Sequence, residues 1–193
     1  MFLQKGIDMT EEKVLIKING VEHYLSNVIK FVNVFLSIVA TLPEEQDFKD
    51  VNLVNKALFA YAGIKTYGNR TINNFFEEKG IIGLSELGEF SKKTNKRTCN
   101  KYNINIVNLC NFLNSLRYFT NQSCVTKSLK ILSKRDDLPG YISTFLRRFV
   151  TRPNDRMADF TDGEHYDIQL VNQSDELCAL YTSGTPVYNR YNW

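Results

Sequence analysis

Apolar residues recur every three or four positions through several stretches of the chain. This spacing indicates amphipathic helices, because residues three and four apart share one helix face. It predicts helices over residues 21–42, 50–64, 71–79, 85–93, 102–120, 123–133 and 141–150, with one more helical turn over 153–160. The stretch 102–120 has the most continuous apolar face and is expected to supply the centre of the core.

Two stretches depart from the helical spacing. Residues 13–18 alternate loosely and end at Asn19-Gly20, a turn signal, so they are either a short strand or part of an arm. Residues 165–171 are a candidate strand, and the turn-rich, aromatic sequence after them is typical of an extended tail. We expect an all-α fold. The N-terminal arm is placed at 1–20, the single helical bundle core at 21–162 and the extended C-terminal tail at 163–193.

Positive charge is concentrated in the middle of the chain. Residues 91–158 carry fourteen Lys and Arg against three Asp, whereas the whole chain has a net charge of only +3. Such a block predicts a surface that binds a polyanion, because neutralising phosphates releases condensed counterions. The alternative is a charged face that contacts only solvent.

The basic residues fall on three successive elements: a polar loop over 92–101, a lysine stripe on the next helix and an arginine cluster on the one after. Packed side by side, these elements would line one groove. The candidate RNA-binding residues are Lys92, Lys93, Lys96, Arg97, Lys127, Lys130, Lys134, Arg147, Arg148 and Arg152. Tyr102, Tyr118 and Tyr141 are candidate platforms for base stacking, with ordinary packing as the alternative.

Candidate catalytic chemistry is sparse. The four cysteines form no CxxC pair, so free thiols in a reducing compartment are expected rather than a zinc site. His165 has acidic neighbours but no nucleophile at a matching position. We expect no enzyme, no cofactor, no metal and no membrane segment, and hence a soluble intracellular protein.

Two short motifs carry a family resemblance. Asn114-Ser115-Leu116-Arg117 and Arg156-Met157-Ala158-Asp159-Phe160 resemble two landmarks of the coat proteins of flexuous filamentous plant viruses (closterovirus-, potyvirus- and carlavirus-like). In that family an LR segment on a core helix is followed, roughly 45 residues later, by an aromatic-flanked A-D-F or A-F-D motif.

The resemblance implies a structural ion pair between Arg117 and Asp159. It also implies an all-helical core and single-stranded RNA in a basic groove. Subunits would polymerise into a helical filament through the N-terminal arm and the C-terminal tail, in the virion or host cytoplasm.

A structural RNA-packaging protein, such as a viral coat or nucleocapsid subunit, is therefore the leading hypothesis. One alternative is a helical interaction module of the viral Bcl-2-like kind, which grips a partner helix in an apolar groove. The other is a DNA-binding regulator that uses the helix pair predicted over 71–93, with Gly80 and Gly83 in the turn.

Overall fold

The computed structural model describes residues 14–42, 48–53, 68–117, 126–152 and 157–171. Within them the fold is mixed α/β, with five helices and seven strands in three small antiparallel sheets. The prediction of an all-α fold is therefore wrong. The helices are α2 (Leu25–Thr41), α4 (Gly68–Glu78), α5 (Ile106–Leu116), α6 (Thr126–Ser133) and α7 (Gly140–Thr151). The strands are β1 (Leu15–Ile18), β2 (Val21–Tyr24), β3 (Ile82–Glu86), β4 (Phe90–Ser91), β5 (Lys96–Arg97), β6 (Lys101–Ile104) and β7 (Ile168–Val171).

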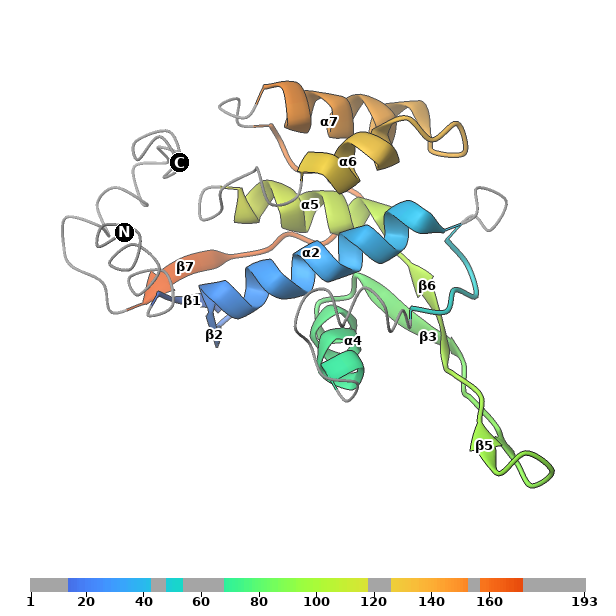
Figure 1. The fold of residues 1–193 in the computed structure, drawn as a ribbon. Helices are drawn as coiled ribbons and strands as arrows, with labels where there is room; N and C mark the ends of the chain where they lie inside the picture. The colour runs from blue at the N-terminus through green and yellow to red at the C-terminus, as the bar shows by residue number, and fades with distance from the viewer. Residues whose placement is uncertain (1–13, 43–47, 54–67, 118–125, 153–156, 172–193) are drawn as a thin grey trace, which may run out of the picture.

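The helices form layers (Figure 1). Helices α6 and α7 pack against each other above α2 and α5, and α4 lies beneath them. The sheet of β1, β2 and β7 covers one end of this body, and the β3–β6 hairpin leaves it at the other end. Among the described residues, no helix has both the length and the apolar character needed to cross a membrane.

The first sheet begins at the Asn19-Gly20 turn. Both residues have positive φ angles, 50° and 84°, as a type I′ hairpin turn requires. The turn pairs β2 with β1, so residues 21–24 form a strand and the helix begins only at Leu25. On its other side β1 pairs with β7, which joins the arm and the tail predicted from the sequence in one sheet.

The core connects three helices through aromatic rings. Phe35 of α2, Phe76 of α4 and Phe112 of α5 are all at most 1% exposed. The rings of Phe35 and Phe76 stack at 4.1 Å between centroids, and Phe112 meets Phe76 edge-on at 6.4 Å. These contacts add to the area buried by each ring and fix how α4 lies against the other two helices.

Asparagines on α5 hold the segment that leads from α7 to β7. Asn111 is fully buried; its Nδ2 donates to the carbonyls of Phe160 (3.0 Å) and Glu164 (2.9 Å), and its Oδ1 accepts from the Phe160 amide (2.8 Å). Asn108 accepts from the Glu164 amide at 2.8 Å, and Asn114 donates to the Met157 carbonyl at 2.8 Å. Residues 157–160, the described part of the helical turn predicted over 153–160, are therefore not helical. The asparagine side chains pair backbone groups that would otherwise be buried without a hydrogen-bond partner.

Two further predictions fail where apolar spacing resembled a helix. Residues 85–93 are not helical, because Leu84, Leu87 and Phe90 lie along a two-stranded extension and are 42%, 61% and 58% exposed. Residues 50–53 are not helical: Asp50 has a φ of 50°, and Val51 forms an isolated bridge with Tyr102 of β6. The remainder of the helix predicted over 50–64 lies outside the described residues.

Candidate nucleic-acid interface

The β3–β6 hairpin continues outward as a two-stranded arm, defined here as residues 86–101 (Figure 1). Beyond the pairing of β3 with β6, the amide of Thr98 donates to the Glu89 carbonyl at 2.9 Å, and β4 pairs with β5. A Cβ at Gly88 would lie 1.9 Å from the Thr98 carbonyl oxygen, so only glycine allows this approach. The stretch predicted to be a basic loop is therefore a paired ribbon.

The arm is basic and exposed. Lys92, Lys93, Lys96, Arg97 and Lys101 are all exposed, and no acidic residue occurs between Phe90 and Lys101. In the turn, Asn95 has a φ of 52°, a left-handed conformation that asparagine tolerates and that lets β4 reverse into β5 within a few residues. The reversal brings four of the five cations together around the turn, and like charges at short range repel one another.

An exposed aromatic ring accompanies these cations. Phe90 pairs in register with Arg97 and is 58% exposed. Phe90 is not among the binding residues predicted from the sequence, because it lies within the helix predicted over 85–93. A signal was present: an apolar ring directly before a run of lysines suits an interface in which bases stack and phosphates pair.

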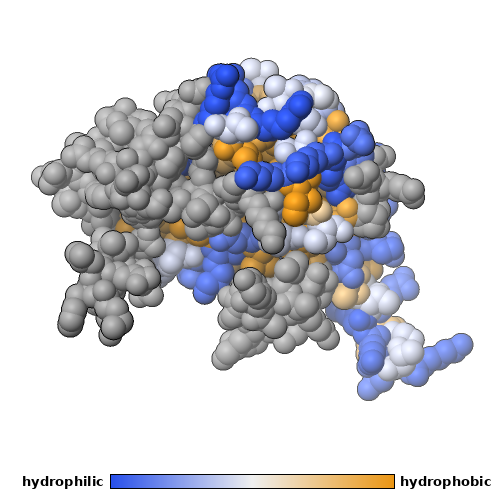
Figure 2. Space-filling view, turned by 45° about the horizontal axis from the view of Figure 1, so that its top comes forward, coloured by the Kyte–Doolittle hydropathy of each residue, from blue (hydrophilic) through white to orange (hydrophobic). Residues whose placement is uncertain are grey.

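The other predicted basic residues lie on α6, α7 and their ends. Lys130, Lys134, Arg147, Arg148 and Arg152 are exposed there, and Lys127 is in α6 but outside the residues whose side chains are described. In Figure 2, hydrophilic side chains cover the end of the arm and, separately, the top of the molecule where α6 and α7 lie. The structure thus divides the predicted residues between two surfaces, rather than along one groove.

The tyrosines predicted to stack on bases differ in their surroundings. Tyr102 is only 7% exposed and is part of the core. Tyr141 is 53% exposed, and its ring meets Phe160 edge-on at 5.5 Å between centroids. Tyr118 lies outside the described residues. Within the described part, Phe90 therefore offers a more exposed ring than Tyr102 and lies beside the basic tip.

The ion pair expected between Arg117 and Asp159 is not formed. Arg117 is 1% exposed at the end of α5, where its Nη2 donates to the Arg152 carbonyl (3.2 Å) and its guanidinium lies 4.6 Å from the Phe149 ring centroid. Asp159 instead accepts from Nδ2 of Asn114 at 2.8 Å. Arg117 lies on the same side of α5 as Asn114 but nearly one turn further along the helix. At that level its guanidinium meets the end of α7, and Asn114 is the α5 side chain that pairs with Asp159.

The second carboxylate oxygen of Asp159 lies 3.2 Å from Nδ1 of His165. A carboxylate can orient an imidazole in this way in an acid–base site. The His165 side chain is 60% exposed, however, and Asp159 is the hydrogen-bond partner recorded for its ring in the described part of the chain. Among the described residues, no three His, Cys, Asp or Glu side chains are grouped to hold a metal ion.

The comparisons with known proteins add no relative. No family model matches the sequence, and no significant match is found among curated proteins or solved structures. The geometry of the arm and the composition of its surface therefore carry the functional argument by themselves.

Proposed function

We propose that this protein binds single-stranded RNA through the basic arm, without sequence readout along the backbone. The observation that carries the proposal is the placement of Lys92, Lys93, Lys96 and Arg97 on an exposed ribbon with no acid between Phe90 and Lys101. The fifth cation, Lys101, pairs with Glu86 at 3.3 Å. Such a ribbon can follow a phosphate backbone with several contacts at once. Arg97 can bridge phosphate oxygens in two places, whereas each lysine supplies a point charge.

The exposed ring of Phe90 favours single strands over duplex. Unpaired bases present their faces and stack on aromatic side chains, with about 1–3 kcal/mol per stacked base. Bases in a duplex are already stacked, so a surface ring gains less from them. Lysines on both sides of the tip then supply the phosphate contacts next to the stacked base.

Packaging of RNA by self-assembly is the narrower form of this proposal. It requires that subunits associate when they bind RNA, with the α6–α7 basic surface as a second contact to the same strand or to a neighbouring one. The expected behaviour is a large, salt-labile particle in size-exclusion light scattering after RNA is added, and a small species without RNA.

The two alternatives lose their structural basis. A DNA-binding regulator with a helix pair over 71–93 needs a second helix, but residues 82–86 and 90–91 are strands. The Bcl-2-like module presupposes an all-helical groove, and the described fold is mixed α/β. Neither the DNA-binding regulator nor the Bcl-2-like module is therefore our proposal for this protein.

A salt titration tests the proposal. Fluorescence anisotropy with a labelled single-stranded 12-mer would be measured between 50 and 200 mM salt. Each neutralised phosphate on a single strand contributes about −0.7 to the slope of log K against log salt, so four contacts predict a slope of about −2.8 and a loss of affinity of roughly 50-fold across this range. Binding that does not depend on salt contradicts the proposal.

A matched pair of variants locates the interface. Lys92→Glu with Lys93→Glu reverses two charges on the arm, and Lys130→Glu with Lys134→Glu reverses two on the α6 side. All four residues are exposed, so both variants are expected to fold. The arm variant is expected to weaken binding at least about tenfold and to reduce the salt slope by about 1.4. An equal loss in both variants would mean that total charge, and not the arm, determines binding.

A further inference from the structure

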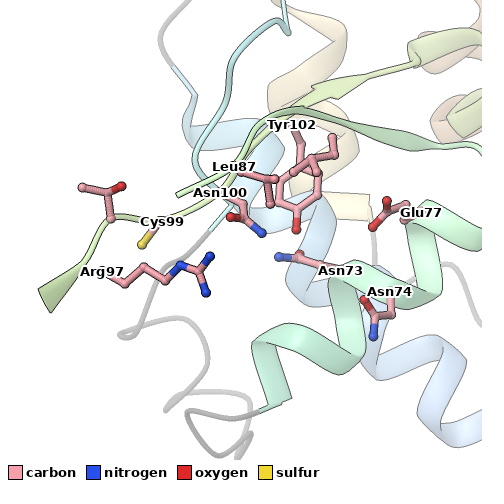
Figure 3. A pocket seen from close by; sticks show the side chains of 10 residues that line it. Asn73, Asn74, Glu77, Leu87, Arg97, Cys99, Asn100 and Tyr102 are labelled. Carbon is pink, nitrogen blue, oxygen red and sulfur yellow. The ribbon is translucent and has the colours of Figure 1, made fainter. Parts of the chain in front are cut away.

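A cleft lies between α4 and the base of the arm, with a volume of about 510 Å³. This volume is within the roughly 300–1,000 Å³ of pockets that hold small-molecule ligands. Figure 3 shows the arrangement: Arg97 stands at one end, Glu77 of α4 at the other, and Asn73, Asn100 and Tyr102 lie between them.

The polar groups of the cleft are partly held in place by the arm. Nε of Arg97 donates to the Gly88 carbonyl at 3.0 Å, which fixes the guanidinium at one end. Oδ1 of Asn100 accepts from the Gly88 amide at 2.7 Å, so the nitrogen of the same side chain is directed to the cleft. The backbone of Gly88 therefore positions two residues that line the cleft, Arg97 and Asn100. Because both belong to the arm, the shape of the cleft depends on the pairing of the arm strands.

On the opposite wall, Asn73 is only 6% exposed, and its side chain lines the cleft. Its amide atoms are not sealed from solvent, so a polar group of a bound ligand could replace water as their hydrogen-bond partner. Figure 3 shows its amide directed into the cleft below Tyr102, on the side that faces Arg97. The group is therefore placed to pair with a bound polar ligand. Leu84, Leu87 and the ring of Tyr102 supply apolar surface beside it.

The ligand that matches this order is flat and partly apolar, with an anionic group at one end and hydrogen-bond donors at the other. A carboxylate only accepts hydrogen bonds, so Glu77 selects a donor. Carboxylates accept from the N4 amino group of cytosine, whereas uracil has a carbonyl oxygen at the same position and would meet Glu77 with lone pairs.

We propose that the cleft receives one unpaired nucleotide of the bound strand, with a phosphate at Arg97 and an amino-bearing base, such as cytosine, at Glu77. This inference rests on the proposed function and adds a base preference to it. The arm would hold the backbone regardless of sequence, and the cleft would discriminate among the bases that enter it.

Two labelled RNA octamers, oligo(C) and oligo(U), test the inference by anisotropy at fixed salt. The two octamers have the same sugar–phosphate backbone, and cytosine carries an amino donor where uracil carries a carbonyl oxygen. The chain is expected to prefer oligo(C) by about fivefold or more. Glu77→Gln is expected to reduce the ratio to near one, because an amide also donates to the uracil oxygen. The matched control Glu89→Gln removes the same charge from an exposed arm residue outside the cleft lining and should keep the ratio.

The outcomes separate the two proposals. If neither octamer binds, the proposed function fails and the cleft inference fails with it. If both bind equally, or if Glu77→Gln leaves the ratio unchanged, RNA binding stands and the base preference is overturned. The arm variant with Lys92→Glu and Lys93→Glu should weaken both octamers and keep their ratio. Far-UV circular dichroism confirms that each variant is folded before its binding is compared.

Discussion

Replacing Asn111 by alanine is expected to remove the strongest single connection between α5 and the segment 157–164. Three hydrogen bonds of 2.8–3.0 Å would be lost at a fully buried position. The amide of Phe160 and the carbonyls of Phe160 and Glu164 would each lose a partner. A buried group left unsatisfied costs about 1–3 kcal/mol, and carbonyls retain some capacity elsewhere, so we expect a loss of about 4 kcal/mol in the free energy of unfolding.

Urea denaturation followed by circular dichroism measures this loss as a lower midpoint at an unchanged slope. Asn27→Ala is the matched control, because Asn27 is exposed on α2 and should change the free energy by less than about 0.5 kcal/mol. Asn111→Asp separates hydrogen bonding from volume: the side chain keeps its shape, but a carboxylate oxygen would then face two carbonyls. If Asn111→Asp behaves like the natural protein, or if Asn111→Ala costs less than about 1 kcal/mol, the reasoning is refuted.

Two further predictions concern pH. Burial is the main cause that lowers the pKa of Lys79 to about 8 from 10.5, against the opposing effect of Glu78. Between those values the unfolded chain binds a proton that the folded chain has released, so stability should rise from pH 8 to about 9, and Lys79→Met should reduce that rise in urea titrations. Above about pH 9 the Cys110 thiol opposes the rise, because burial raises its pKa to about 12. The hydrogen bonds from Arg135 hold the pKa of Asp137 below its ordinary value, so their stabilisation is expected to be lost as the pH falls through the folded pKa. Asp137→Ala should cost about 3 kcal/mol at pH 7 and flatten the acid limb of thermal unfolding, whereas the control Asp136→Ala, at an exposed neighbour, should do neither.

Helices with sustained apolar spacing were predictable from the sequence. The central parts of α2, α5, α6 and α7 all lie inside predicted helices, because repeated burial of one face imposes a period of 3.6 residues. The strands have two to five residues each, too few for a period of two to be distinguished from a helix. Their partners also lie far away: Leu15 pairs with Val171, and a local pattern contains no information about such pairing.

The sequence also contains a signal for the asparagine contacts of α5. Asparagines recur at every third position from Asn105 to Asn114, within the helix predicted to supply the centre of the core. Asn105 caps the helix by accepting from the Asn108 amide at 3.0 Å, and the next three bind a passing backbone. Their spacing indicates a polar line on a buried helix face, and such a line requires a partner with many backbone groups.

Several features of the arm are energetically unfavourable in the isolated protein. The arm crowds like charges that repel one another, exposes Leu87 and Phe90 to water, and adds little to the core. Each of these features disfavours a stable isolated fold, and among the arm cations only Lys101 has a recorded ion pair, with Glu86 at 3.3 Å, in the described part of the chain. A polyanion with unpaired bases offsets both costs together, because phosphates neutralise the lysines while bases cover the apolar side chains. A neutral protein partner would cover the apolar residues and leave the repulsion. An anionic membrane surface would also offset both costs, but it offers no base edge to the polar groups of the cleft, and this difference favours a nucleic acid.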